Sequence, residues 1–181
     1  MIISKSPYEA LSPQIDLPKV EREILSFWST QEIFHKSLSQ RAGGESWTFY
    51  EGPPTANGMP GTHHIEARVF KDVFPRYQTM KGKYVLRKAG WDCHGLPVEI
   101  AVEKELGFSG KGDIEKFGIA AFNEKCRESV TRHVDAFSAM TERMGFWVDF
   151  DQAYWTMAPE YVESVWWSLK EIWKKGLLVQ D

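Results

Sequence analysis

The sequence is poor in cysteine and contains no long apolar run. Cys93 and Cys126 are the two cysteines among 181 residues, and they do not form a paired motif. This pattern argues against a disulfide framework and is typical of reduced thiols in a cytosolic protein. The first residues lack the apolar segment of a signal peptide, and no stretch approaches the roughly 20 apolar residues of a membrane span. We therefore expect a cytoplasmic protein with no membrane partner.

The sequence also lacks internal repeats, low-complexity segments and a strong excess of either charge. Its formal net charge is −3, so the surface as a whole does not indicate nucleic-acid binding. Hydrophobic residues make up 43% of the chain, and it has 8 tryptophans, so it can bury a substantial core. This length and composition predict one domain, or one domain with a fragment of another.

Neither common phosphate-binding fingerprint is present, because there is no G-x-G-x-x-G and no P-loop. Residues 49–64 nevertheless have the layout of a phosphate site. A predicted strand at Trp47–Tyr50 leads into a loop with three Pro and three Gly between Gly52 and Gly61, and a helical pattern opens at Ile65. Free N–H groups at the start of a helix attract anions, and glycine lets the backbone approach them.

Two histidines stand at the start of that helical pattern. His63 and His64 could donate hydrogen bonds that strengthen as charge develops on a phosphate. The alternative is an ordinary connection between strand and helix, with both histidines at surface or cap positions. Together with Cys93 and His94 they could also be read as metal ligands, but their spacing matches no usual zinc pattern.

A second loop, Gly90–Pro97, follows a second predicted strand at Tyr84–Leu86. Strand, helix and strand in this order form a βαβ unit, whose strands are parallel. Ligands of such units bind beyond the carboxyl ends of the strands, so both loops are expected to face one crevice. Asp92 could hold an ammonium group there, or it could serve only an Asx turn or a helix cap.

The rest of the pattern is mostly helical. It predicts helices over 16–28, 31–38, 65–77, 97–106, 119–144 and 159–175, a connection over 147–155 and a strand over 177–179. Pro75 predicts a kink or an early end in its helix, and His133 is expected at the core or its boundary. The last helix is expected to face inward with Val162, Val165, Trp166, Leu169, Ile172 and Trp173. Seven basic residues between Arg68 and Lys88 could track phosphates, although a solvated helix face is the favoured interpretation.

Four segments carry a resemblance to a known family. They are Phe49-Tyr50-Glu51-Gly52-Pro53-Pro54-Thr55-Ala56-Asn57-Gly58, Gly90-Trp91-Asp92-Cys93-His94-Gly95-Leu96-Pro97-Val98-Glu99, and the pair Cys126–Val130 and Val165–Lys170. With them the chain closely resembles the isoleucyl-tRNA synthetases, a group of class I aminoacyl-tRNA synthetases, over nearly its whole length. The second segment is specific, because the related valyl and leucyl enzymes differ there.

The resemblance implies roles for individual residues. The family's His-Ile-Gly-His signature falls on Gly61, Thr62, His63 and His64, which would bind ATP; here His64 keeps its place, while Gly61 and His63 depart from the signature. His63 would supply the imidazole that is absent at residue 61. In the amino-acid pocket, Gly52 and Pro53 would line the side chain and Asp92 would hold the α-ammonium group.

The resemblance also implies what the chain is part of. It predicts an α/β fold with an N-terminal helical leader over 1–46, irregular over 1–15, and the first half of a Rossmann-like catalytic domain over 47–181. The second signature Lys-Met-Ser-Lys-Ser, the editing insertion and the anticodon-binding region lie downstream in the family and are absent here, as is any zinc site of those parts.

The implied function is ATP-dependent activation of isoleucine and its transfer to tRNA(Ile), with Mg²⁺ accompanying ATP and no protein metal site in this segment. We expect the full protein to act as a monomer and the segment alone to be inactive. The alternative is a non-catalytic fragment or paralogue that binds a nucleotide or a protein partner.

Overall fold

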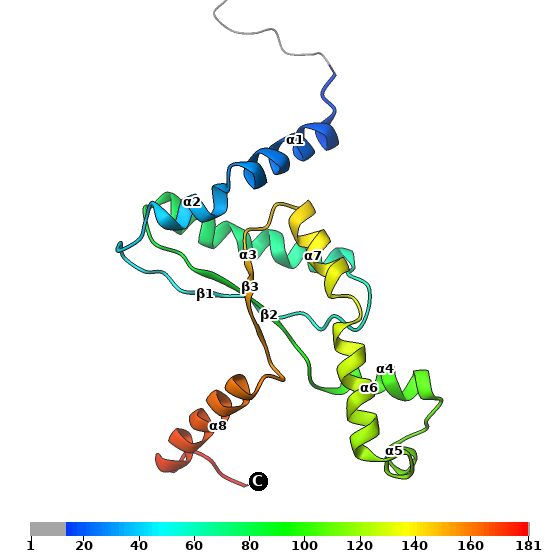
Figure 1. Ribbon diagram of the computed structural model, residues 1–181. Helices are drawn as coiled ribbons and strands as arrows, with labels where there is room; N and C mark the ends of the chain where they lie inside the picture. Colours follow the sequence, from blue (N-terminus) through cyan, green and yellow to red (C-terminus); the bar gives the residue numbers. More distant parts are fainter. Residues whose placement is uncertain (1–13, 181) are drawn as a thin grey trace, which may run out of the picture.

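The computed structural model describes residues 14–180, so most of the predicted irregular leader lies outside the described residues. A three-stranded sheet is surrounded by helices in this part of the chain (Figure 1). In chain order the elements are α1 (Leu17–Thr30), α2 (Ile33–Ser39), β1 (Phe49–Tyr50), α3 (Thr62–Met80), β2 (Arg87–Trp91), α4 (Leu96–Leu106), α5 (Lys111–Phe117), α6 (Ile119–Thr131), α7 (Val134–Arg143), β3 (Asp149–Trp155) and α8 (Pro159–Lys174). The mixed α/β class is confirmed.

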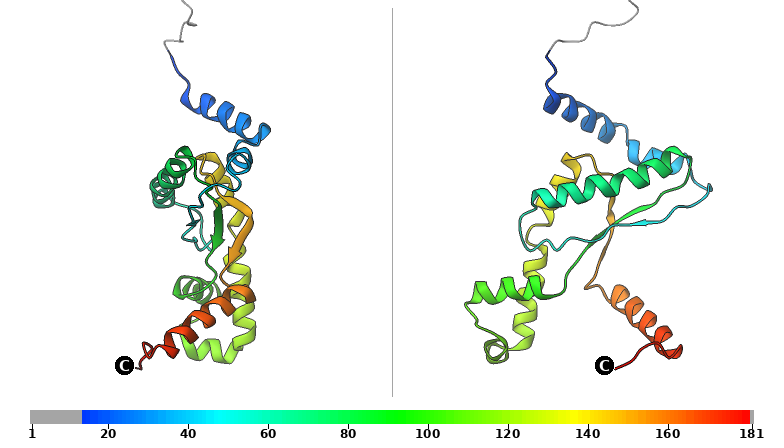
Figure 2. Two further views of the ribbon diagram at one scale, coloured as in Figure 1. Left: turned by 90° about the vertical axis from the view of Figure 1, so that its left-hand side faces the viewer. Right: turned by 180° about the vertical axis from the view of Figure 1, so that it is seen from behind.

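The sheet is parallel, with the strand order β1-β2-β3. Phe49 of β1 pairs with Arg87 of β2, and α3 connects the two strands, so the predicted βαβ unit is confirmed. The second strand begins at Arg87, later than predicted, because Tyr84 makes only an isolated bridge to Ser46. Figure 2 shows α3 running beside the sheet with α7 next to it.

The predicted connection over 147–155 is wrong, because most of it forms β3. Aspartate is depleted in strands, and the short alternation over 148–151 is broken by the polar Gln152, so the sequence does not identify a strand here. Pairing with β2 overrides this weak pattern, and the register shifts between Lys88 and Gly90. Phe150, Ala153 and Trp155 thereby pack against the buried core.

Gly90 allows β3 to reach across the central strand. The ring of Tyr154 lies over Gly90, and a Cβ atom there would come within 2.4 Å of the ring. The Tyr154 hydroxyl donates a 2.7 Å hydrogen bond to the carbonyl oxygen of Glu51, at the end of β1. Glycine at residue 90 therefore permits a side chain of β3 to fix the start of the first loop.

The long helix predicted over 119–144 is interrupted, which corrects that prediction. It divides into α6 and α7, with His133 as the N-terminal cap of α7. The backbone N–H of His133 donates to the carbonyl oxygen of Ala56 at 2.9 Å instead of continuing the helical ladder. His133 itself is half-buried, as expected of a boundary residue. The sequence of the helix could not reveal this break because its partner lies in the first loop.

Helix α3 continues through Pro75 to Met80, so of the two predicted effects of this proline the early end is wrong, while the kink stays a prediction. The Asp72–Arg76 ion pair spans the proline, and the Thr79 hydroxyl donates to the Pro75 carbonyl at 2.8 Å. The apolar stripe of α3 faces outward, whereas Arg68 is buried. The stripe residues are 40–66% exposed: Ile65, Val69, Phe70, Val73, Phe74 and Tyr77. Charged groups of α3 thus face the molecule and apolar groups face away from it.

The basic run is partly internal, which corrects its interpretation as a solvated face. Arg68 and Arg87 are 4% and 1% exposed. Burial lowers the pKa of Arg87 to about 10, although nearby Asp72 opposes the shift. Arg76 binds Asp72 at 2.5 Å and also donates to the Gly145 carbonyl. Much of the positive charge therefore serves internal contacts.

Aromatic rings cover these cations and attach the N-terminal helices. The guanidinium carbon of Arg76 lies 4.3 Å from the ring centre of Trp147 and 5.3 Å from that of Trp28. Arg87 lies 5.9 Å from the Phe34 ring. Contacts of this kind contribute about 0.5–2 kcal/mol each. They join α1 and α2 to α3 and β2, while the predicted domain boundary at residue 46 stays a prediction.

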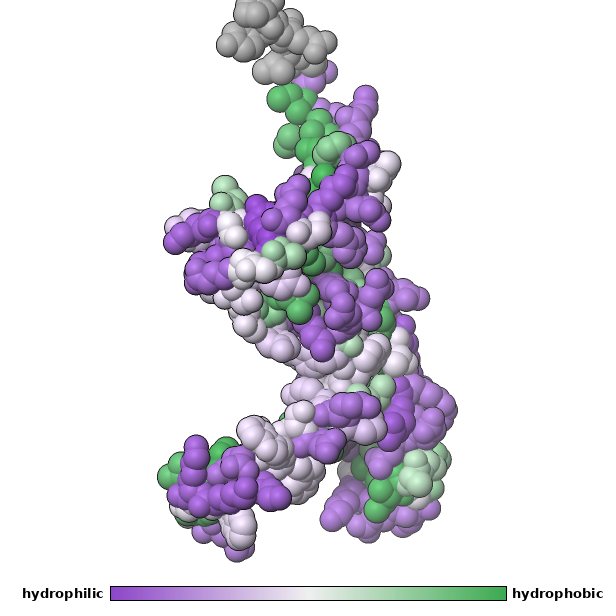
Figure 3. All heavy atoms as spheres, turned by 60° about the vertical axis from the view of Figure 1, so that its left-hand side comes forward, coloured by the Kyte–Doolittle hydropathy of each residue, from purple (hydrophilic) through white to green (hydrophobic). Residues whose placement is uncertain are grey.

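The predicted inward packing of the last helix is wrong. None of the 16 residues of α8 is buried, and the helix projects from the sheet (Figures 1 and 3). Hydrophobic residues reach the surface of both α1 and α8 in Figure 3. Residues 177–179 form no strand, so that prediction is also wrong. At the other end, Asp16 caps α1 and accepts the Lys19 N–H at 3.1 Å.

Within the described residues, no helix is both long and apolar enough to cross a membrane.

We predict that Gly90→Ala destabilises the chain by about 1–3 kcal/mol, because the new methyl group must displace the Tyr154 ring. Thermal and urea unfolding measure the change. Gly112→Ala is the matched control, since nothing lies within 4 Å of a Cβ atom there. It should leave stability unchanged or raise it by up to about 1 kcal/mol. Equal stability of the two variants would contradict the proposed close approach.

Candidate functional site

The two loops predicted to face one crevice are tied together. The Asp92 N–H donates to the Pro54 carbonyl at 3.0 Å, and the Asn57 side-chain amide donates to the Pro97 carbonyl at 2.9 Å. Ala56 is fully buried in the same core cluster as Trp91 and Cys93. The first loop is therefore anchored on the core, beside the second.

Contacts of Glu51 and of the Gly52 carbonyl fix the backbone at the end of β1. Glu51 is 3% exposed and forms a 2.5 Å ion pair with Lys71 of α3, whose ammonium group also lies 3.3 Å from the Gly52 carbonyl. Gly52 itself is exposed and Pro53 is half-buried. These contacts hold the loop backbone while leaving its outer surface accessible.

The first loop ends at the N-terminus of α3, where Gly61 is the cap residue. The His64 N–H donates to the Gly61 carbonyl, and the Gly61 N–H donates to Nδ1 of His64, both at 3.0 Å. Because a backbone N–H can only donate, Nδ1 is the acceptor and the proton of the neutral ring lies on Nε2. The half-buried ring thus presents an N–H donor next to a helix N-terminus.

The electrostatic environment keeps His64 neutral at pH 7. Burial lowers the pKa of His64 below its usual value, and electrostatic interactions with His63 and Arg68 lower it further, although the Gly61 hydrogen bond opposes them. An edge-to-face contact with Phe137, at 4.8 Å between ring centres, orients the imidazole. Its position and protonation fit a hydrogen-bond donor rather than a fixed cation.

The exposed His63 ring lies against Gly61. A Cβ atom at residue 61 would come within 2.9 Å of Cε1 of His63, so the ring occupies the space that a side chain there would need. The rings of His63 and His64 are 3.9 Å apart, and Thr62 before them is exposed. All four residues of the predicted nucleotide-binding segment therefore lie in the cap and first turn of α3.

The carboxylate of Asp92 accepts three hydrogen bonds. The Thr55 hydroxyl donates to Oδ2 at 3.3 Å, the His94 N–H donates to Oδ1 at 3.3 Å, and the Thr156 hydroxyl donates to Oδ1 at 3.4 Å. The His94 contact is the Asx turn that the sequence left as an alternative. A carboxylate has about four lone-pair sites, so capacity for one further donor remains on Oδ2.

Sequence reasoning missed Thr55 and Thr156. Thr55 lies inside the first loop, so its closeness to Asp92 follows once the loops are known to meet. Thr156 follows β3, which the sequence did not indicate as a strand, and no local signal pointed to it. Its hydroxyl could be found only from the tertiary structure.

The metal-site interpretation of His63, His64, Cys93 and His94 finds no support in the part of the chain that the structure covers. Residues 14–180 contain no group of three or more His, Cys, Asp or Glu placed to hold a metal ion. Cys93 is buried, and burial raises the pKa of its thiol, which disfavours the thiolate that metals need. A metal ion that accompanies a bound nucleotide would have no protein cage here.

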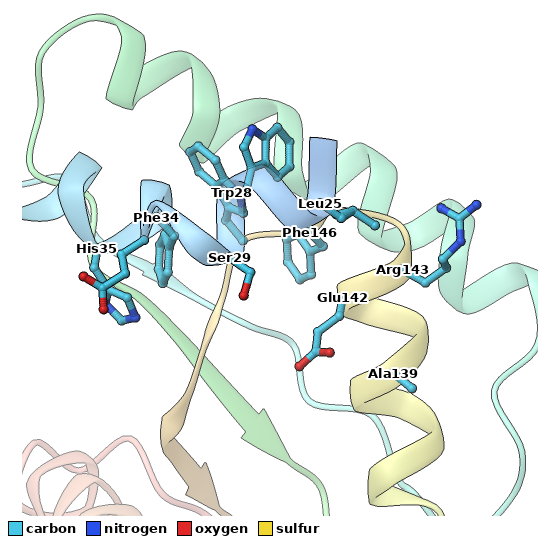
Figure 4. Close-up of a pocket in the computed structure, with 12 residues that line it drawn as sticks. Leu25, Trp28, Ser29, Phe34, His35, Ala139, Glu142, Arg143 and Phe146 are labelled. Carbon is cyan, nitrogen blue, oxygen red and sulfur yellow. The ribbon is translucent and has the colours of Figure 1, made fainter. Parts of the chain in front are cut away.

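A cavity of about 680 Å³ lies apart from this site, between α1, α2 and α7. Figure 4 shows Glu142 of α7 pointing toward the space beneath Ser29, with Phe34 and Phe146 nearby. None of the predicted site residues lines this cavity. The candidate site is the pair of tied loops, and the cavity is a separate feature.

Comparisons with known proteins agree on one family. Residues 23–181 match the family model described as tRNA synthetases class I (I, L, M and V). The chain is 70% identical over 174 residues to an isoleucine–tRNA ligase of Cutibacterium acnes and 69% identical over 178 residues to one of Thermobifida fusca. These matches cover 96% and 98% of the chain but only 16% and 17% of the relatives, so the chain spans about one-sixth of their length.

A solved structure supports the fold. The chain superposes on a LeuRS of Agrobacterium radiobacter, determined as a ternary complex with tRNA and LeuAMS, with a TM-score of 0.56 and 23% identity. The match covers 93% of this chain and 19% of that one. The family match over residues 23–181 shows that the chain belongs to the class I tRNA synthetases.

Proposed function

We propose that the chain is the N-terminal part of an isoleucine–tRNA ligase, which activates isoleucine with ATP and transfers it to tRNA(Ile). The observation that carries the proposal is the pair of tied loops, of which the first ends in a histidine donor at a helix N-terminus and the second holds the Asp92 carboxylate. A phosphate site beside an ammonium site is what joining an amino acid to a nucleotide requires. The identity to two isoleucine–tRNA ligases supports the choice of amino acid.

In the proposed activation step, a carboxylate oxygen of isoleucine attacks the α-phosphate of ATP and pyrophosphate leaves. The Nε2–H of His64 and the first N–H groups of α3 donate to the phosphate oxygens as negative charge grows on them. His63, lying in the space beside Gly61, supplies a second imidazole. ATP carries its own Mg²⁺, which neutralises phosphate charge when bound.

In the proposed amino-acid site, Asp92 accepts a hydrogen bond from the α-ammonium group. Gly52 and Pro53 line the side chain of isoleucine; Gly52 has no side chain to obstruct it, and Lys71 and Glu51 steady the adjacent backbone. This arrangement fixes the reacting carboxylate relative to the α-phosphate, and such positioning is a large part of catalysis.

The outward apolar stripe of α3 supports the proposal that this chain belongs to a longer protein. Large apolar patches on soluble proteins usually mark contact surfaces, and the matched relatives are about six times longer than the chain. We call that longer protein the full-length ligase. The same experiments can be done with a chimera in which this chain replaces the matched segment of the C. acnes relative. We expect it to act as a monomer.

We predict that the 181-residue chain alone shows no measurable isoleucine-dependent pyrophosphate exchange or tRNA charging, because half of the catalytic domain is absent. The full-length ligase, assayed in parallel, should show both. Charging by the chain alone would contradict the claim that its site is incomplete. Inactivity of the full-length ligase would instead favour the alternative of a non-catalytic nucleotide-binding or partner-binding paralogue.

We predict that His64→Ala in the full-length ligase slows adenylate formation by roughly 10²–10³-fold and changes isoleucine affinity little, because it removes a donor to the developing phosphate charge. Pre-steady-state adenylate formation and isoleucine titration give the two values. His35→Ala, at an exposed histidine of α2, is the matched control and should change neither. His63→Ala tests the second imidazole. An equal loss of rate and of isoleucine affinity would mean that His64 serves only as a helix cap.

We predict that Asp92→Asn in the full-length ligase weakens isoleucine binding by roughly 10- to 150-fold, since a hydrogen bond to a charged group contributes about 1.5–3 kcal/mol. ATP affinity should barely change. Calorimetric titration of each ligand measures both, with Asp151→Asn, at an exposed aspartate of β3, as the charge-matched control. Asparagine also forms Asx turns, so unchanged isoleucine affinity would leave Asp92 with the turn role alone.

A further inference from the structure

We propose that Thr156 is a positioning residue for the amino-acid site, holding the Asp92 carboxylate toward the ammonium group of the substrate. The inference rests on the proposed role of Asp92. Thr156 directly follows β3, 64 residues from Asp92, and is only 6% exposed. It touches none of the substrates in the proposed arrangement and acts through its neighbours.

The hydroxyl of Thr156 has three polar partners. It accepts the Cys93 N–H at 2.8 Å, contacts Oδ1 of Asp92 at 3.4 Å, and lies 3.2 Å from Nδ1 of His94. A hydroxyl can donate once and accept twice. All three contacts are satisfied when it accepts from Cys93 and from Nδ1–H of His94 and donates to Asp92. The negative charge of the carboxylate favours this direction.

The backbone fixes Thr156 at this place. Its N–H donates to the carbonyl of Trp91, the last residue of β2, at 3.1 Å, so the pairing of β3 with β2 extends one residue beyond β3. Thr156 and Asp92 are thus carried by adjacent strand ends, and their separation is set by the sheet. Thr55 holds the other carboxylate oxygen from the first loop.

This placement determines the direction of the remaining lone pair on Asp92. Oδ1 is occupied by Thr156 and His94, so the carboxylate cannot rotate without breaking contacts on the buried side. Oδ2 then faces the first loop with capacity for a further donor. Without the Thr156 hydroxyl the carboxylate can rotate, and binding of an ammonium group must first restrict it, which weakens affinity.

The test compares Thr156→Val and Thr156→Ser in the full-length ligase by isoleucine-dependent pyrophosphate exchange. Valine keeps the shape and removes the hydroxyl; we expect the KM for isoleucine to rise about 10-fold, or ~1.4 kcal/mol, with the KM for ATP changed less than about twofold. Serine keeps the hydroxyl and should restore the KM for isoleucine to within about threefold of the original value.

A matched control separates positioning from folding. Thr141→Val removes another buried threonine hydroxyl, which donates to the Phe137 carbonyl at 2.7 Å inside α7. It should lower thermal stability, as Thr156→Val also does by leaving the Cys93 N–H unpaired, but it should leave the KM for isoleucine unchanged. A parallel rise in that KM for both valine variants would mean that lost stability, and not positioning, causes the effect.

A double-mutant cycle tests the route of action. If Thr156 acts through the Asp92 carboxylate, adding Thr156→Val to Asp92→Asn should change the KM for isoleucine less than about twofold further. A full further 10-fold rise would overturn the inference, as would a normal KM in Thr156→Val when Asp92→Asn is impaired. A normal KM in Asp92→Asn itself would refute the proposed ammonium site on which the inference rests.

Discussion

The burial of Ala56 is the constraint on which the rest of this structure depends. Ala56 is fully buried in the middle of a loop of turn-forming residues, and its carbonyl accepts the His133 N–H at 2.9 Å. A buried backbone carbonyl needs such a partner, and supplying it divides one helix into α6 and α7. The loop is therefore held in the core at its centre, while its ends reach Asp92 on one side and His64 on the other. Loops of this kind carry function because a rigid scaffold positions them.

Much of the fold follows from local patterns that the tertiary structure supports. The predicted helices over 16–28 and 97–106 form as α1 and α4, where Asp16 caps the first and Gly107, in a left-handed conformation, ends the second. The failures share one cause, which is that the deciding partner is distant in sequence. Residues 149–155 can be recognised as a strand only from their pairing with β2 and from the fit of Tyr154 over Gly90. The helix break at His133 can be recognised only from its hydrogen bond to Ala56. Helix α8 has the apolar spacing of a packed helix, yet none of its residues is buried, and Tyr161 in its first turn stacks on Tyr154 of β3.

The residues of the candidate site also fall into two groups: those that the sequence indicates and those that only the tertiary structure reveals. His64 and Asp92 belong to the segments that follow the two strands of a βαβ unit. Composition and spacing alone therefore predict that they lie at one edge of a parallel sheet. The ring of His63 beside Gly61 also follows from adjacency in the chain. Thr156 belongs to a different class of residue, because its importance depends on hydroxyl geometry at a strand end that the sequence did not reveal. Residue identities can thus indicate the groups that touch a ligand more readily than the groups that orient them.

The outward apolar face of α3 has a consequence for biosynthesis. The ion pair of Asp72 and Arg76 lies on the inner side of this helix, and its apolar stripe is open to solvent in the described part of the chain. At 5–20 residues per second, a ribosome needs roughly one to three minutes to finish a relative about six times longer. In the longer protein proposed above, this stripe would stay in contact with water until later segments cover it. Apolar surface that is exposed during synthesis promotes aggregation.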